Sequence, residues 1–372
     1  MKRKNPFLRL LLAPFSFLYG FITGFRNQLF EWKILPAERY PVPVICVGNI
    51  TVGGTGKTPF TEYLIALIKK RYRIAALSRG YMRNTKGFLW VNQDTDASDA
   101  GDEACQIKRK FPDITVAVDS NRRRGIHRLL ALPKAEQPEV ILLDDAFQHR
   151  FVTPSLSIML TDFNDMYYDD ALLPAGNLRE SMVGVYRADI IVVTKCNEIM
   201  KPIDLRIIEK NMNLMASQHL YFSKIKYLPL EALFPLHVTQ SFSLDASKPQ
   251  DVELLLIAGI AKPQQFVNQV KAYKTPVKTF LFRDHHRFTA SDIQNIHAEF
   301  QKLSPKKRRI ITTEKDAMRL KTLAFLPDEW KSCLFFLPVS VDFLFDQSET
   351  FDLRILTHIM STINIYRKNV KN

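Results

Sequence analysis

The sequence predicts an α/β protein with two lobes, each a parallel sheet with flanking helices, preceded by a hydrophobic N-terminal helix. Short apolar runs alternate with helical stretches, as they do in parallel sheets. The alternation gives way to a more extended, less regular pattern after Tyr221, and then resumes. With 372 residues, the chain has the length of about two domains. The boundaries we expect are 1–35 for the N-terminal segment, 36–220 for the first lobe, 221–249 for the connection and 250–372 for the smaller C-terminal lobe.

The N-terminal segment has the composition of a membrane anchor. Basic residues precede an uncharged run over residues 10–25, and Arg26 follows it. The run is shorter than the ~20 residues that cross a bilayer, and Pro14 weakens it as a spanning helix. It lacks a cleavage site of small residues, so a secretory signal is not expected. We expect a short insertion or an interfacial helix with its basic flank on an anionic cytoplasmic leaflet. The alternative is a buried helix of a soluble domain.

The remaining elements follow from local periodicity. Phe60, Tyr63, Leu64, Leu67 and Ile68 recur at helical spacing. Strands are expected over 42–47, 73–77, 114–118, 140–143 and 188–194 in the first lobe, and over 254–258, 277–282, 309–312 and 333–338 in the second; helices are expected over 58–70, after Thr289 and over 352–366.

Composition limits the partners and the compartment. Hydrophobic residues make up 46% of the chain, which is enough for a large core. Lys plus Arg exceed Asp plus Glu by 52 to 38, and the net charge of +14 predicts an anionic partner. Nucleic acid, an acidic membrane surface and a phosphorylated substrate all fit. The four cysteines form no C-x-x-C pair and are interpreted as buried thiols in a reducing compartment.

A glycine-rich loop follows the first expected strand. Gly53, Gly54 and Gly56 let backbone N–H groups turn toward phosphate oxygens, Lys57 reaches the β- and γ-phosphates, and Thr58 is a ligand for Mg²⁺. The helix that follows adds its positive N-terminus. The strict motif fails at its first glycine, where Thr51 stands. The predicted nucleotide-binding segment is Gly53, Gly54, Thr55, Gly56, Lys57, Thr58 and Pro59; the proline is tolerated in a first helical turn.

Two acidic sites accompany this loop. Asp144 and Asp145 end an apolar strand, which is the arrangement that holds Mg²⁺ in phosphate-loop enzymes, although many strands end in Asp. The second site contains Asp99, Asp102 and Glu103, where one carboxylate is a candidate base and its neighbour a candidate metal ligand. A solvated acidic loop explains the second site equally well.

Further polar residues are candidates for catalysis and phosphate binding. In the segment 284–286, a histidine next to Asp284 is a candidate for orienting or activating a carboxylate. Arg179 lies in a turn with its own glycine, and its guanidinium suits phosphate; the run 122–124 is either a second phosphate site or a solvated face. Ser78 and Arg79 end a strand, where open α/β sheets bind ligands.

Several motifs together resemble the tetraacyldisaccharide 4′-kinase family, the lipid A kinases of Gram-negative bacteria. The Pro59 that follows the loop and the Asp-Asp-x-Phe-Gln-His segment are the most diagnostic. Ala146 departs from the glycine usual in the family. The matching segments, in family order, are 48–49, 53–59, 78–81, 101–103, 144–150, 173–180, 193–195, 284–285 and 313–317.

The resemblance implies a function and a set of roles. Family members transfer the γ-phosphate of ATP to the 4′-hydroxyl of a tetraacylated glucosamine disaccharide 1-phosphate, giving lipid IVA, at the cytoplasmic face of the bacterial inner membrane. The implied cofactors are ATP and Mg²⁺, the implied partners are the lipid and an anionic membrane surface rather than nucleic acid, and the oligomeric state stays open. By motif match, Asp102 is the catalytic base, His285 assists it (His286 stays an alternative), and Lys57 is the third catalytic residue. The implied metal ligands are Thr58, Glu103, Asp144 and Asp145. The implied residues at the substrate or phosphate are Ser78, Arg79, Gln148, His149 and Arg179.

Two other functions remain open from the residues alone. The Thr194-Lys195 pair is similar to the guanine-reading element of GTPases, but Asn197 replaces its aspartate. Such an enzyme turns over GTP equally and does not phosphorylate lipid. A module that binds ATP only as a structural ligand is the other alternative, and it predicts that Asp102→Ala leaves function intact.

Overall fold

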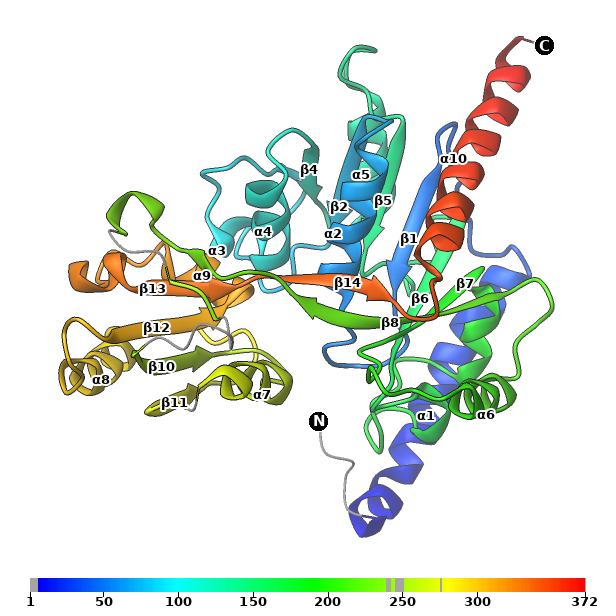
Figure 1. The fold of residues 1–372 in the computed structure, drawn as a ribbon. Helices are drawn as coiled ribbons and strands as arrows, with labels where there is room; N and C mark the ends of the chain where they lie inside the picture. Colours follow the sequence, from blue (N-terminus) through cyan, green and yellow to red (C-terminus); the bar gives the residue numbers. More distant parts are fainter. Residues whose placement is uncertain (1–5, 239–241, 245–250, 275, 372) are drawn as a thin grey trace. The chain divides into compact units, whose positions relative to one another are not determined.

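The computed structural model describes residues 6–238, 242–244, 251–274 and 276–371 (Figure 1). Within this part of the chain, two compact units separate. The smaller unit is Lys226–Ser340, and the larger one combines Lys2–Ile225 with Val341–Asn372. The sequence-based boundaries assign residues 341–372 to the C-terminal lobe, whereas in the structure these residues belong to the larger unit, which contains the first lobe. The reason is packing: Phe351, Ile355 and Ile359 of the last helix are buried in the core of the larger unit.

The larger unit is built on a sheet of nine strands, counted over the described residues, in the order β14-β8-β7-β6-β1-β5-β2-β4-β3. From β8 to β4 all neighbours run parallel, and β3 is antiparallel to β4. The strands are β1 (Val44–Gly48), β2 (Ile74–Ser78), β3 (Leu89–Trp90), β4 (Thr115–Val118), β5 (Val140–Asp144), β6 (Leu156–Asp162), β7 (Ile190–Thr194), β8 (His219–Tyr227) and β14 (Val339–Phe343).

Helices cover both faces of this sheet because alternate residues of each strand point to opposite sides. Ile45 and Val47 face one hydrophobic layer, which also contains residues of α2, α4 and α10. Val44 and Cys46 face the other, with residues of α5 and α6. The helical elements of this unit are α1 (Pro6–Glu31), α2 (Lys57–Ile68), α3 (Ala97–Ala100), α4 (Asp102–Lys110), α5 (Arg122–Leu130), η1 (Tyr167–Asp169), η2 (Met182–Arg187), α6 (Pro202–Met212) and α10 (Ser348–Lys371).

The smaller unit repeats the same architecture on a smaller scale. Its sheet has the order β11-β10-β12-β13-β9 over the described residues, parallel except for β9. Separate hydrophobic clusters cover its two faces. Its elements are β9 (Glu231–Ala232), η3 (Pro235–His237), β10 (Glu253–Ala258), α7 (Gln264–Tyr273), β11 (Lys278–Leu281), α8 (Ala290–Gln301), β12 (Arg308–Thr313), α9 (Glu314–Leu320), η4 (Asp328–Ser332) and β13 (Leu334–Leu337). The predicted class, parallel α/β sheets in two lobes plus an apolar N-terminal helix, is confirmed.

Helix α1 is longer than the uncharged run predicts, and it continues through Pro14. Among the described residues, it is the one helix with the length and composition to cross a membrane. An 18-residue stretch of it has a mean hydropathy of 1.5, and 6% of that stretch is buried. Its exposed side is made of large apolar side chains, such as Phe7 at 75%, Leu10 at 74% and Phe17 at 79% exposed. Ser16 and Phe30 are its buried residues.

Candidate active site

The predicted site residues of the larger unit gather where parallel strands end. Strand β1 leads into the glycine-rich loop, and its neighbour β5 ends at Asp144, which is in register with Val47. On the far side of β5, β2 ends at Ser78. Because the carboxyl ends of parallel strands lie at one edge of a sheet, the topology brings three motifs that are far apart in sequence to a common edge.

The glycine-rich loop adopts a conformation that needs its glycines. Gly53 and Gly56 have φ angles of 120° and 80°, in the range that disfavours side chains. Gly56 is the N-cap of α2, so Lys57, Thr58 and Pro59 form the first helical turn. Asn49 closes the loop from inside: its Nδ2 donates to Thr55 Oγ1 at 3.0 Å, and its Oδ1 accepts from Lys57 Nζ at 3.3 Å.

The irregular Thr51 has a structural explanation. It forms an isolated antiparallel bridge with Leu178, and the next residue, Val52, donates its N–H to Asn177 O at 2.8 Å. Thr51 is only 7% exposed. The start of the loop is therefore held by backbone pairing with a distant segment, and an extended residue suits that position better than a glycine.

A second pair of residues supports the loop from the end of β7. Thr194 Oγ1 donates to Thr55 O at 2.8 Å, and Lys195 Nζ contacts Gly54 O and the carboxylate of Asp162, the latter at 3.1 Å. Asn49, Thr194 and Lys195 lie in motifs that the sequence marks, but their part in shaping the loop is visible only in the structure.

Lys57 and Arg179 both approach the carboxylate of Asp145. The distances are 3.6 Å from Lys57 Nζ and 3.1 Å from Arg179 Nη1 to Asp145 Oδ1. Burial would raise the pKa of Asp145, but these two cations outweigh burial and the pKa lies below its ordinary value. The loop lysine and the predicted phosphate-binding arginine thus meet on one ionised carboxylate.

Asp144 is the buried partner in this acidic pair. It is 5% exposed and accepts a hydrogen bond from Thr61 Oγ1 at 3.0 Å. Burial, and then the neighbouring Asp145 carboxylate, raise the pKa of Asp144 to about 6. Glu103 adds to the rise, so its charge lies within electrostatic reach of Asp144.

Asp102 and Glu103 open helix α4 beside the loop after β2. Gly101, the N-cap, has a φ of 89°, and a Cβ there would lie 3.0 Å from Tyr81 O. Ser78 Oγ turns toward the same loop and accepts from Gly80 N at 3.4 Å. The close approach of two glycine-containing loops therefore sets Asp102 next to the segment that carries Ser78 and Arg79.

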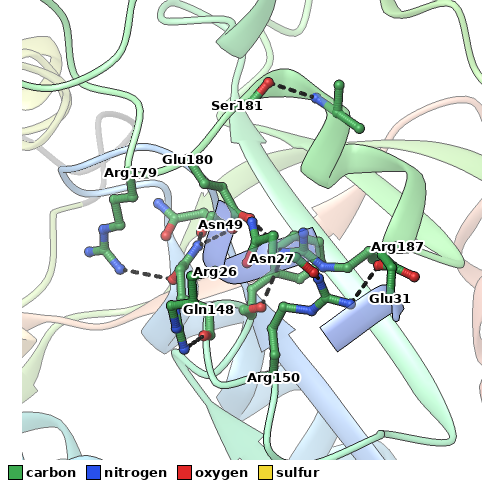
Figure 2. Close-up of polar contacts among 12 residues, drawn as sticks. Arg26, Asn27, Glu31, Asn49, Gln148, Arg150, Arg179, Glu180, Ser181 and Arg187 are labelled. Carbon is green, nitrogen blue, oxygen red and sulfur yellow. Dashed lines mark hydrogen bonds and ion pairs between the residues drawn. The ribbon is translucent and has the colours of Figure 1, made fainter. Parts of the chain in front are cut away.

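Gln148 and Glu180 connect Asn49, just before the glycine-rich loop, to helix α1 (Figure 2). Gln148 Nε2 donates to Asn49 O at 2.7 Å and to Glu180 Oε1 at 2.9 Å. Glu180, which is 3% exposed, also accepts from Arg187 at 2.8 Å and from Asn27 Nδ2 of α1 at 3.3 Å. Glu180 was not among the predicted site residues, although it lies in a family motif, because only tertiary structure shows where its carboxylate points.

Helix α1 contacts the site residues directly. Tyr19 OH donates to Arg179 O at 2.6 Å, and Arg26 donates to Gln148 O at 3.3 Å. Arg150 Nη1 donates to Asn27 O at 2.9 Å (Figure 2). One side of the apolar helix is therefore a wall of this site.

His149 lies among positive charges. Burial, and then Arg122 and Arg26, lower the pKa of His149 to about 4, so its ring is neutral at pH 7. Arg123 and Arg79 act in the same direction. Arg122 itself is 2% exposed and donates to Asp119 O at 2.9 Å. Four guanidinium groups thus act electrostatically on a neutral histidine, and their positive charge favours an anion such as phosphate.

The smaller unit contains the predicted histidine. His285 Nε2 lies 3.1 Å from Lys315 Nζ, and Nδ1 lies 3.4 Å from Arg319 Nη2. His286 instead pairs with Asp292 at 2.9 Å, inside the capping box of α8. The second histidine thus has a role in the helix cap, whereas the first faces two basic side chains.

The oxygen ligands predicted for Mg²⁺ fit that ion's chemistry. Within the described residues, no group of three or more His, Cys, Asp and Glu side chains is gathered as a metal site. A magnesium ion in a nucleotide site usually keeps several waters and takes one or two carboxylates plus phosphate oxygens. The hydroxyl of Thr58 and the carboxylates of Asp144 and Asp145 are donors of that kind.

Comparison with known proteins identifies the family. The sequence profile described as "LpxK: Tetraacyldisaccharide-1-P 4'-kinase" matches residues 8–360. A Parabacteroides distasonis protein described as "Tetraacyldisaccharide 4'-kinase" is 53% identical over 357 residues, covering 95% of each chain. A Bacteroides thetaiotaomicron protein of the same description is 44% identical over 365 residues, covering 97% of this chain and 94% of the relative.

A solved structure agrees with this relationship. The crystal structure of "apo" form LpxK from Aquifex aeolicus in complex with ATP superposes with a TM-score of 0.72 and 28% sequence identity. The superposition covers 95% of this chain and 99% of the other. This chain belongs to the tetraacyldisaccharide-1-phosphate 4′-kinase family, as its motifs predict.

Proposed function

We propose that this protein transfers the γ-phosphate of ATP to the 4′-hydroxyl of a tetraacyldisaccharide 1-phosphate, giving lipid IVA, at the cytoplasmic face of the inner membrane. Family membership over nearly the whole chain supports the reaction. The observation that carries the site assignment is the meeting of Lys57, Asp145 and Arg179 at the glycine-rich loop. Two cations at a loop whose N–H groups suit phosphate oxygens are what phosphoryl transfer requires.

The residue roles follow from charge and position. Lys57 and Arg179 now share Asp145, and a bound triphosphate would supply them with further anionic oxygens. Asp102, at the start of α4, is the proposed base: the 4′-oxygen attacks the γ-phosphorus, the bond from that phosphorus to the bridging oxygen breaks, and the hydroxyl proton passes to Asp102. The role of His285 that the family resemblance implies stays a prediction.

Magnesium is the proposed metal cofactor. Thr58, Asp144 and Asp145 would hold it, with Glu103 nearby, and it would neutralise charge on the β- and γ-phosphates. The raised pKa of Asp144 supports this assignment, because burial and the neighbouring Asp145 carboxylate both disfavour its charged form, and a cation at this position would offset them.

The membrane location is supported by α1. The substrate is acylated and stays in a bilayer, so the enzyme must come to it. The apolar outer side of α1 suits that contact, and the net charge of +14 favours an anionic leaflet. ATP is supplied on the cytoplasmic side. In this proposal residues 1–35 are the anchor, and residues 36–220 carry the phosphate loop and base.

The proposal is tested by ³²P transfer from ATP to the disaccharide lipid in detergent micelles. Lys57→Ala and Asp102→Asn should each lower kcat by ~10²-fold or more. Asp99→Asn is the matched control, because Asp99 is exposed and lies three residues before Asp102. Wild-type protein that turns over nucleotide without labelling the lipid would overturn the kinase proposal, and equal loss in the Asp99 variant would overturn the assignment of Asp102.

A further inference from the structure

Helix α6 exposes apolar side chains on its outer side. Ile203 is 56% and Ile207 is 51% exposed, and Ile199, just before the helix, is 85% exposed. The inner side is already satisfied, because Ile208 and Met212 are each 5% exposed in the core. Positions four apart lie on one face of a helix, so Ile203 and Ile207 form a stripe that the core does not need, and Ile199 is exposed in the turn before it.

The same face is basic. Arg206 and Lys210 follow Ile203 and Ile207 by three residues each, and both are exposed. Glu209 is exposed on the flank of this face, away from the stripe. A helix that shows isoleucine together with arginine and lysine has the composition of one that lies in the headgroup region of an anionic bilayer.

Element η2 of the same unit also exposes apolar side chains. Met182 is 43%, Val183 is 68% and Tyr186 is 44% exposed. Figure 1 places α1 and α6 in the same region of the larger unit. Exposed apolar side chains thus occur on α1, η2 and α6 of the same unit.

We infer that the outer face of α6, defined by Ile199, Ile203, Ile207, Arg206 and Lys210, is a second membrane contact that lies in the headgroup region of an anionic bilayer. The inference rests on the proposed membrane location and adds a second point of attachment to it. A single apolar helix leaves the enzyme free to rotate about the helix axis. A second contact at α6 fixes that rotation, and so fixes how the active-site edge meets the lipid headgroups.

The test uses full-length protein and vesicles of phosphatidylethanolamine and phosphatidylglycerol. Ile203→Ser with Ile207→Ser should lower the partition coefficient by ~10-fold, as expected when two partly buried isoleucines are removed from an interface. Leu353→Ser with Met360→Ser is the matched control, because these α10 residues are 67% and 53% exposed. Phe17→Ser separately measures the contribution of α1 to vesicle binding.

A site-specific probe gives a second readout that does not depend on affinity. The described cysteines are all buried, so Ile203→Cys can be labelled with an environment-sensitive fluorophore. We expect a blue shift on addition of vesicles, quenching by brominated lipids, and no change for a probe at Leu353→Cys.

The outcomes separate the two proposals. An unshifted probe at position 203 and unchanged binding of the α6 variant, with weakened binding of the Phe17 variant, would overturn the α6 contact and leave the anchor intact. Wild-type protein that does not bind vesicles at all would overturn the membrane proposal itself. If the α6 variant changes sedimentation from dimer to monomer at unchanged vesicle binding, the face binds a second copy and the inference is wrong.

Discussion

Replacing Asp144 by asparagine should make the nucleotide-free protein more stable and much less active. Asparagine keeps the shape of the side chain and the acceptor for Thr61 Oγ1, but it removes the buried charge. The pKa of Asp144 is raised from 3.8 to about 6, so ionisation at pH 7 costs roughly two units at 1.36 kcal/mol each, or about 3 kcal/mol. At ~2–4 °C per kcal/mol, Asp144→Asn should raise the melting temperature by ~6–12 °C at pH 7.5.

The direction of the pKa shift determines how the effect of Asp144 on stability changes with pH. A carboxyl whose pKa is higher in the folded than in the unfolded state is protonated in both states below pH 3.8, and it then has no influence on stability. Between pH 3.8 and 6 the folded state holds more protons, so wild-type stability falls as pH rises, and above pH 6 the loss is constant. The advantage of Asp144→Asn should therefore be largest above pH 6 and disappear near pH 4.

Asp145 is the internal control for this reasoning, because its pKa is shifted in the opposite direction. Its carboxylate is stabilised by Lys57 and Arg179, so Asp145→Asn should lower the melting temperature at pH 7.5, and that loss should shrink as the pH falls below the ordinary pKa. Circular dichroism at several pH values, without nucleotide, measures both variants. A melting temperature of Asp144→Asn at or below wild type at pH 7.5, or a difference that persists at pH 4, would refute the argument.

Four further variants test other parts of the protein. Lys57→Met should reduce lipid phosphorylation by ~10³-fold while the protein stays folded, as measured by ³²P transfer and circular dichroism. Gly48→Ala should destabilise the protein by ~1–3 kcal/mol in a melting experiment, because the new Cβ would lie 2.6 Å from Phe147 Cβ. Glu180→Gln should lower kcat by ~10-fold in micelles and leave vesicle binding unchanged. Phe17→Ser should weaken vesicle binding and leave kcat unchanged. If both variants change both measurements to a similar extent, the two faces of α1 do not have separate roles.

The sheet was predictable where strands are continuous apolar runs. Strands β1, β2, β4, β5 and β7 lie within a residue or two of their expected positions, because buried parallel strands consist mainly of branched apolar residues. Strand β6 was not predicted although it lies in the middle of the sheet. Its Ser157, Thr161 and Asp162 are buried and polar, so they interrupt the apolar run. Lys195, distant in sequence, pairs with the Asp162 side chain.

The site shows the same division between local and tertiary information. The glycine-rich loop and the acidic pair could be predicted because each is a contiguous motif with its own chemistry. The reason why Thr51 stands in place of the first glycine could not be predicted, because its partner Leu178 lies far away along the chain. The same holds for Glu180, since a glutamate in a motif gives no local sign of whether it faces solvent, substrate or another buried side chain.

Helix α1 combines two functions that composition alone would separate. Its outer side is typical of a membrane anchor, and a purely hydrophobic pattern predicts that truncation affects attachment and little else. Its inner side, however, donates from Tyr19 and Arg26 to the backbone of Arg179 and Gln148. Asn27 donates to Glu180, which holds Gln148 against the glycine-rich loop. Removing the helix would therefore remove part of the active-site wall together with the anchor, so only substitutions confined to one face can separate attachment from catalysis.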